Sequence, residues 1–116
     1  MLDVSIRLHK NHILFGKDEL DWSEFESFDD ENGPIRGFWG LKTWLIEQGL
    51  FVDEFSALLS IENVKQLYKV LSTNSLPIVV EYNRTEKINR LLNIIKNVME
   101  KGDLQADKTL EIFCSC

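Results

Sequence analysis

The side chains best placed to do chemistry in this chain are the acids crowded between Asp18 and Glu31. This stretch of 14 residues holds eight carboxylates and neither Lys nor Arg: Asp18, Glu19, Asp21, Glu24, Glu26, Asp29, Asp30 and Glu31. The formal net charge of the chain is −6, and removing these eight acids leaves +2 on the other 102 residues. The negative charge is therefore local, and a local field of one sign attracts ligands of the opposite sign.

Large apolar side chains lie between these acids, namely Leu20, Trp22, Phe25 and Phe28. Aromatic side chains supply affinity at protein interfaces by filling pockets, while surrounding like charges speed the encounter with an oppositely charged partner. Crowded carboxylates also repel one another and so lower stability. The pattern predicts that residues 18–31 form a surface that binds a cationic protein.

Two other interpretations of this segment stay open. In the first, Trp22, Phe25 and Phe28 point into the protein's own core and the acids only keep its surface soluble, as charge runs usually do. The second is a calcium loop at Asp29-Asp30-Glu31-Asn32-Gly33. That loop lacks the alternating acids before the glycine and the Glu six residues after it, so we expect no metal there.

The two histidines, His9 and His12, are the candidates for enzymatic chemistry, because paired imidazoles can act as acid and base or bind a metal. They flank a predicted turn at Lys10-Asn11, where they need not share a face, and no neighbouring residue completes a metal-ligand spacing. We therefore expect surface histidines. The chain also lacks a nucleophile elbow, a phosphate-binding glycine loop and a metalloprotease helix motif. The sequence thus predicts a protein that is not an enzyme and needs no cofactor.

The ends of the chain and its cysteines indicate a cytoplasmic protein. Residues 1–7 include Asp3 and Arg7 and contain no apolar run typical of a secretory signal. Cys114 and Cys116 are interpreted as reduced thiols at a strand end, with a redox or metal role as the alternative. No stretch is apolar enough to span a membrane, and a net charge of −6 opposes direct binding to nucleic acid.

Strands are predicted at both ends of the chain. Val4, Ile6 and Leu8 alternate with polar residues, which is the period of a half-buried strand. We expect this strand to form a hairpin with a second one at Ile13 and Phe15. The tail, residues 109–116, offers Leu110, Ile112 and Cys114 on one face and is expected to pair with that hairpin.

Helical spacing of apolar residues predicts the elements between these strands. The clearest is residues 85–101, whose stripe is Ile88, Leu91, Leu92, Ile95, Val98 and Met99. We also expect a helix over residues 35–48, continued helical periodicity over 51–59, a helix over 61–71 capped by Ser60, and a short helical turn begun by a capping box from Ser23 to Glu26. Residues 76–82 are rich in β-branched side chains and predict either a short strand or an extended connector.

These elements predict a single α+β domain over residues 1–116. A small antiparallel sheet, made of the N-terminal hairpin and the C-terminal strand, would pack against three to four helices. The basic residues of the helix at 85–101, with a local charge of +3 over residues 84–101, are expected to neutralise part of the acidic segment.

In size, charge and its acidic, aromatic segment, the chain resembles the immunity proteins of bacterial toxin systems, including contact-dependent growth inhibition systems. The resemblance covers the overall profile and residues 18–31, without a shared motif. It implies an antitoxin that binds a cognate toxin, often a basic nuclease, and blocks its active site. Its carboxylates would occupy the positions of nucleic-acid phosphates, and Trp22, Phe25 or Phe28 would serve as apolar anchors.

Two other functions remain open on the sequence alone. One is a regulatory or adaptor protein of bacterial or phage origin that binds a different basic protein. The other is a small hydrolase or transferase that uses His9 or His12. The sequence does not indicate the oligomeric state.

Overall fold

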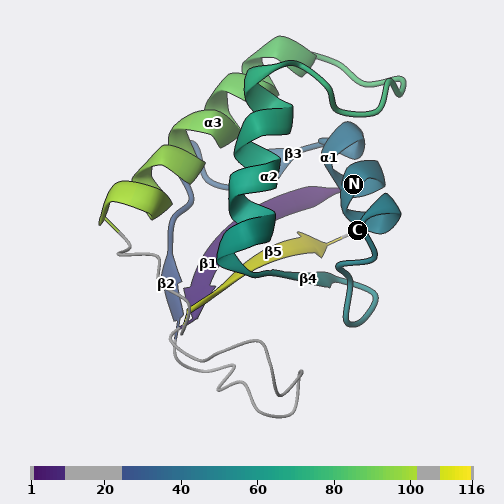
Figure 1. The fold of residues 1–116 in the computed structure, drawn as a ribbon. Coiled ribbons are helices and arrows are strands. Elements are labelled where there is room, and N and C mark those ends of the chain that lie inside the picture. Colours follow the sequence, from purple (N-terminus) through teal and green to yellow (C-terminus); the bar gives the residue numbers. More distant parts are fainter. Residues whose placement is uncertain (1, 10–24, 102–107, 116) are drawn as a thin grey trace.

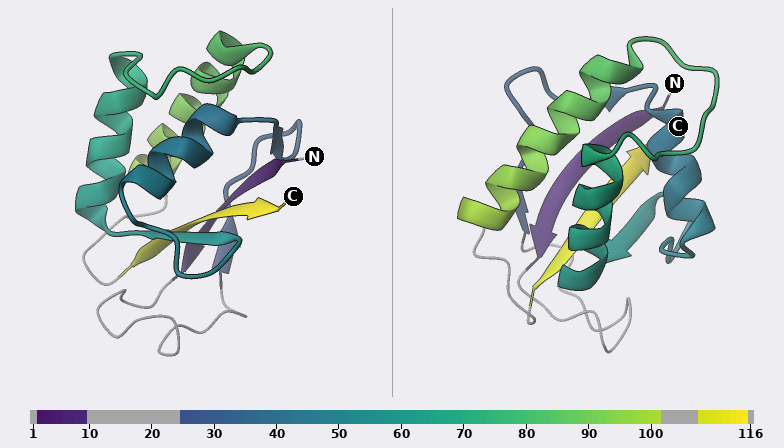
Figure 2. Two further views of the ribbon diagram at one scale, coloured as in Figure 1. Left: turned by 90° about the vertical axis from the view of Figure 1, so that its right-hand side faces the viewer. Right: turned by 45° about the horizontal axis from the view of Figure 1, so that its top comes forward.

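An antiparallel sheet carries three helices on one of its faces, so the chain is an α+β protein, as predicted (Figure 1). The computed structural model describes residues 2–9, 25–101 and 108–115. Turned on its side, the molecule shows the helices stacked above the sheet, with the N-terminal and C-terminal strands next to each other (Figure 2). None of the helices in these described ranges combines the length and apolar composition needed to cross a membrane.

The two terminal strands form the centre of the sheet. β1 (Asp3–His9) and β5 (Thr109–Ser115) pair antiparallel along their whole length, from Asp3 opposite Ser115 to His9 opposite Thr109. β4 (Ser56–Leu59) pairs with the outer side of β5, while β2 (Phe25–Ser27) and β3 (Ile35–Arg36) both pair with the outer side of β1. The predicted terminal strands and their pairing are confirmed, whereas the expected partner strand at Ile13 and Phe15, with its turn at Lys10-Asn11, lies outside the described residues.

The core lies between this sheet and the helices. Val4, Ile6, Leu110 and Ile112 are completely buried, as their alternation along β1 and β5 predicts. α3 (Arg84–Lys101) buries Leu91 and Ile95 of its predicted stripe, while Met99 at its end is partly exposed. α2 (Ile61–Ser72) begins, as predicted, at a capping box in which Ser60 and Asn63 bond reciprocally.

The predicted helix over residues 35–48 begins later than expected. α1 (Trp39–Glu47) starts only after Gly37, whose φ of +70° lies in the left-handed region and cannot continue a right-handed helix. Before it, Ile35 and Arg36 pair with β1. The capping-box prediction is also wrong at Glu26, which lies in β2, whereas Ser23 lies outside the described residues.

The helical interpretation of residues 51–59 is wrong, because this segment doubles back into β4. The Asp53 side chain accepts hydrogen bonds from the backbone amides of Phe55 and Ser56, which makes a turn. Phe51 then lies opposite Ala57. All four residues of β4 are buried, so the strand lacks the alternation that would have distinguished it from a helix.

Candidate functional site

Four side chains form a polar cluster on the sheet face opposite the helices. Glu111 of β5 accepts a hydrogen bond from the Ser56 hydroxyl (2.7 Å) and lies 2.8 Å from His9 Nε2, with an Arg7 nitrogen at 3.7 Å. The expectation of a surface histidine is wrong for His9, which is only 1% exposed. His9 is the last residue of β1, and its imidazole packs beside Glu111 of β5 and Phe25 of β2 instead of facing solvent. His12 lies outside the described residues.

Burial raises the pKa of Glu111, but the hydrogen bonds of His9 and Ser56 and the charge of Arg7 outweigh it and hold this pKa below its usual value. The carboxylate is therefore ionised in the folded protein. The Ser56 hydroxyl donates its hydrogen bond to Glu111 rather than to His9, so the histidine is not placed as a base for that hydroxyl. The cluster thus joins β1, β4 and β5 structurally.

Two acids of the predicted surface turn toward the protein itself. An Asp29 oxygen accepts the backbone amide of Ile6 at 2.8 Å. Asp30 receives two hydrogen bonds of 2.8 Å from Arg90 of α3, which also donates to the carbonyl of Gly33. The hydrogen bonds from Arg90 lower the pKa of Asp30 despite partial burial. The basic helix therefore neutralises one of the acids, as the charge pattern predicts.

The rest of the described part of the segment is more open. Phe25 is 42% exposed, with the Arg7 guanidinium 4.9 Å from its ring centre and the His9 ring 5.6 Å away. Glu26 and Glu31 are exposed, whereas Phe28 packs against the core. We call Phe25, Glu26 and Glu31 the acidic strip. The remaining predicted binding residues, Asp18, Glu19, Asp21, Trp22 and Glu24, lie outside the described residues.

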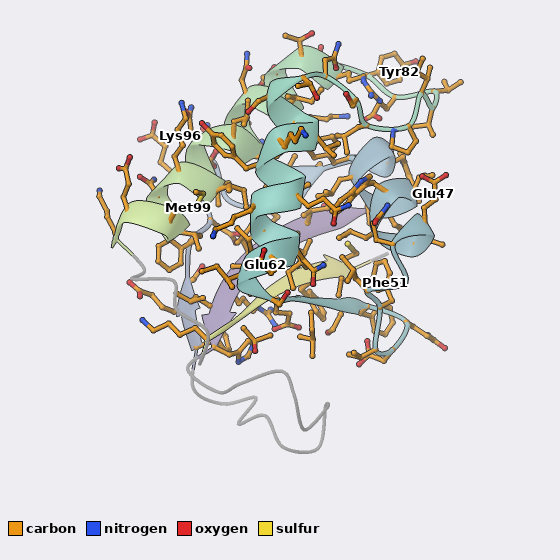
Figure 3. All side chains as sticks on the ribbon, in the orientation of Figure 1. Glu47, Phe51, Glu62, Tyr82, Lys96 and Met99 are labelled. Carbon is orange, nitrogen blue, oxygen red and sulfur yellow. The ribbon has the colours of Figure 1, made fainter. Side chains whose placement is uncertain are left out.

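A second surface, which the sequence interpretation missed, lies between α1 and the start of α3. Residues 76–83, here called the connector, join α2 to α3 in an irregular path. Along it Ile78, Val80 and Tyr82 are 96%, 100% and 88% exposed, and Tyr82 stands at the edge of the molecule (Figure 3). Burying one such apolar side chain is worth roughly 1.5–3 kcal/mol, so three of them at alternate positions mark a surface suited to a partner.

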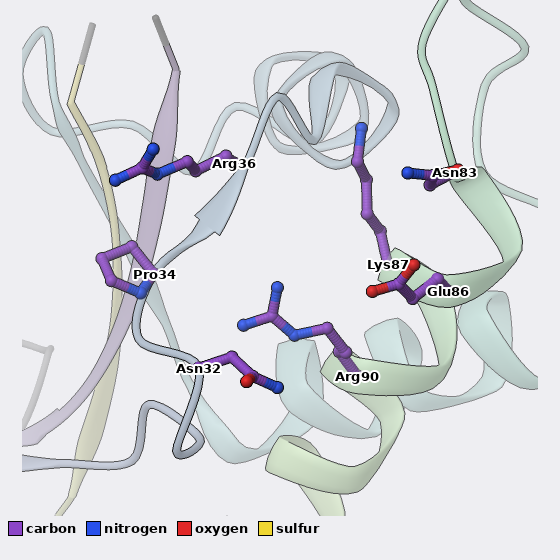
Figure 4. Close-up of a pocket in the computed structure, with 7 residues that line it drawn as sticks. All are labelled: Asn32, Pro34, Arg36, Asn83, Glu86, Lys87 and Arg90. Atoms are coloured by element: carbon purple, nitrogen blue, oxygen red, sulfur yellow. The ribbon is translucent and has the colours of Figure 1, made fainter.

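The connector borders an open hollow of about 610 Å³ beside the start of α1, which we call the connector groove. Trp39, Val80 and Tyr82 supply its apolar walls, and Arg36 and Lys87 line it as well. A smaller, polar pocket adjoins it and shares Arg36, Asn83 and Lys87 with it (Figure 4). The two hollows form one cationic and apolar region.

Hydrogen bonds fix the connector in place. Arg84 donates to the carbonyls of Leu76 (2.7 Å) and Pro77 (2.8 Å), and the Glu81 carboxylate accepts the backbone amide of Gly40 at 2.9 Å. A Cβ at position 40 would lie 2.7 Å from that carboxylate, which explains a glycine inside α1. These contacts hold the connector against α1 and α3 and so preform the groove.

A signal for this surface was present in the sequence. The run Leu76-Pro77-Ile78-Val79-Val80 is strongly apolar, and the structure shows it as a connector rather than as a strand of the described sheet. An apolar connector with no sheet partner has to pack on the core or remain exposed. Only three-dimensional packing decides between these outcomes for each residue.

Compared with known proteins, the chain matches no protein-family model, no curated protein and no solved structure. Across residues 2–9, 25–101 and 108–115, no group of three or more His, Cys, Asp or Glu side chains is arranged to hold a metal ion. Cys114 is buried in the core, and Cys116 lies outside the described ranges. The candidate surfaces within the described residues are therefore the acidic strip and the connector groove.

Proposed function

We propose that this chain is an immunity- or antitoxin-type protein that acts in the cytoplasm by binding a basic protein toxin, with a nuclease as the leading candidate. The observation that carries the proposal is the exposure of β2 at the edge of the described sheet, where Phe25 and Glu26 face solvent. Glu31 adds a third exposed group close by in the chain. An aromatic ring beside carboxylates suits an interface in which charge guides the encounter and the ring supplies affinity.

In this proposal the acids divide into two roles. Glu26 and Glu31 would meet cationic side chains of the toxin that otherwise bind nucleic-acid phosphates. Asp29 and Asp30 would shape the surface instead, because their oxygens already accept hydrogen bonds from Ile6 and Arg90. Arg7 stacks on the Phe25 ring and so limits its motion. A ring held in this way loses less conformational entropy on binding.

The test begins with the product of the gene next to this one, produced as an inactive variant for binding and in active form for inhibition. We expect tight binding that weakens steeply with salt, together with loss of toxin activity. The double variant Glu26→Lys, Glu31→Lys should slow association about tenfold at low salt, because electrostatic steering accounts for factors of that size or more.

The matched control is Glu47→Lys, Glu54→Lys, which changes the net charge equally at two exposed acids away from β2. Glu47 lies on α1, on the opposite side of the molecule (Figure 3). The association rate of this control variant should stay within about twofold of that of the unmodified protein. Equal slowing by both double variants would show that only net charge matters and would remove the acidic strip from the mechanism. Binding without inhibition would instead favour the regulatory or adaptor protein.

A further inference from the structure

The connector groove combines three properties. Its apolar side chains point outward, its backbone is held in place by Arg84, and its surroundings are cationic. Within residues 2–9, 25–101 and 108–115, the backbone amides from Ile78 to Tyr82 donate no hydrogen bond. A pinned segment with unpaired amides and exposed β-branched side chains is suited to receiving an extended chain.

Charge narrows the choice of occupant. The carboxylate of Glu81 is balanced within the fold, because Arg84 lies 3.3 Å and Lys87 4.0 Å from it. The Arg36 side chain is mostly exposed, and its contact with an Asp3 oxygen is long, at 3.7 Å. Lys42 stacks over the Trp39 ring. Around the groove and the adjoining pocket there are five cations, Arg36, Lys42, Arg84, Lys87 and Arg90, and three acids, Asp3, Glu81 and Glu86. The region is therefore positive in a chain whose net charge is −6.

We infer that the connector groove is a docking site for an extended peptide segment of a partner protein, in which apolar side chains alternate with or lie next to carboxylates. The apolar side chains would contact Trp39, Val80 and Tyr82, and the carboxylates would meet the exposed Arg36. Lys87 adds positive charge at the groove wall, but its ammonium already donates to the Gly37 carbonyl and lies beside Glu81. This surface is separate from the acidic strip and of opposite charge. The inference therefore stands independently of the proposed function.

A peptide fits the observations better than a small molecule or a second copy of the chain. The exposed apolar row continues past the cavity to Ile78, which does not line it, so the surface is longer than the hollow. In a two-fold dimer through this face, the same positive patch would lie on both sides of the interface. An acidic partner would have no such repulsion.

The probe is a random dodecapeptide library displayed on phage, panned against the full chain at low salt. We expect the enriched peptides to carry Asp or Glu beside Val, Ile, Leu or aromatic residues. In NMR titrations with the enriched peptides made synthetically, the largest shifts should fall on the Trp39 indole N–H and on the amides of residues 78–82. Enrichment of Lys-rich or Arg-rich peptides, failure to enrich any peptide, or shifts confined to another face would overturn the inference.

Variants separate the groove from the rest of the surface. Val80→Asp and Arg36→Glu should each weaken peptide binding at least about tenfold. The first places a negative charge beside the peptide's carboxylates, and the second replaces the cation that would bind them with an anion. The matched control is Ile46→Asp, another exposed apolar side chain, on the last part of α1. It should leave the affinity unchanged.

Two further results would decide against the inference. One is equal affinity of the Val80→Asp variant and the unmodified chain. The other is a dimer in sedimentation experiments that Val80→Asp dissociates, since this would make a second copy the occupant. The acidic-strip variant Glu26→Lys, Glu31→Lys should still bind the peptides, so failure of this inference and failure of the proposed function remain distinguishable.

Discussion

In the acidic segment charged side chains turn toward the protein, whereas in the connector apolar side chains turn toward solvent. In residues 25–31, two of the four described acids turn inward to the backbone of β1 and to Arg90. In residues 76–83, three of the apolar side chains turn outward to solvent. The inward-facing acids stabilise the fold, and the outward-facing apolar side chains are available to bind a partner. Composition alone therefore does not decide which side of the surface a residue occupies.

The difference has a physical cause in what lies beneath each segment. Residues 29–33 turn beside α3, so a short Asp side chain can reach both a backbone amide and a guanidinium. The connector instead crosses the start of α1, where Arg84 and Glu81 take up the polar contacts. From Pro77 to Tyr82 the exposure alternates, so Ile78, Val80 and Tyr82 face solvent while the residues between them are partly buried; Leu76, before this stretch, is buried in the core.

The comparison predicts that burial, and not crowding, sets how much an acid matters to stability. Glu111, a lone acid in an apolar strand, should therefore be the most important carboxylate. Glu111→Ala should lower the free energy of unfolding by about 2–3 kcal/mol, since it leaves Ser56 and His9 without their acceptor. Urea denaturation measures the change.

Glu54→Ala removes an exposed acid and is the control, with an expected change within about 0.5 kcal/mol. Glu111→Gln keeps one oxygen as an acceptor and should fall between the two. A loss below about 1 kcal/mol for Glu111→Ala would mean that the polar cluster is not a structural centre.

The second prediction concerns Asp30 and Arg90, which distinguish an engaged acid from an exposed one. Asp30→Ala and Arg90→Ala should each destabilise the protein by about 1–2 kcal/mol, because the pair is bidentate and only partly exposed. Removing both should cost less than the sum of the two single changes. Strictly additive losses in this double-mutant cycle would show that the ion pair contributes nothing.

Sequence patterns were sufficient where one face of an element is buried. The alternation in β1 and β5, the stripe of α3 and the capping box at Ser60 each follow from such an arrangement. They predicted the α+β class and the pairing of the two ends. The same patterns do not identify β4, because this strand is buried on both faces and shows no alternation.

The contacts of the site residues depend on packing between segments that are far apart in the chain, and sequence patterns do not predict that packing. Asp30 and Arg90 are 60 positions apart, and His9 and Glu111 are 102 apart. The charge pattern indicated only that α3 and the acidic segment would attract each other. Which carboxylate pairs, and which ring stays exposed, follows from the turn geometry of residues 29–33 and the register of β1.

The third prediction uses pH to separate engaged acids from exposed ones. Glu111 and Asp30 both have lowered pKa values in the fold, so the unfolded chain takes up protons first as pH falls. Their contribution is complete above their unfolded values of about 4.5 and 3.8 and is lost as pH drops through the lower folded values. Unfolding measured from pH 7 to pH 2 should show stability falling at the acid end.

The double variant Glu111→Gln, Asp30→Asn should be less stable at pH 7 and should flatten that acidic decline. The pair Glu26→Gln, Glu31→Gln changes two exposed acids of the same strip region and should leave the decline in place. If both double variants flatten it equally, the lowered pKa values of the engaged acids are not its source.

The smallest expected effect belongs to the connector, and it is the sharpest test of the comparison. Val80→Asp and Tyr82→Ser should change the free energy of unfolding by no more than about 0.5 kcal/mol, because both side chains are already in water. Leu76→Ala, in the same connector but with its side chain buried, should lose about 2–3 kcal/mol. Thermal unfolding of the three variants measures this contrast. Destabilisation by Val80→Asp as large as that by Leu76→Ala would show that the outer row of the connector serves the fold and is not reserved for a partner.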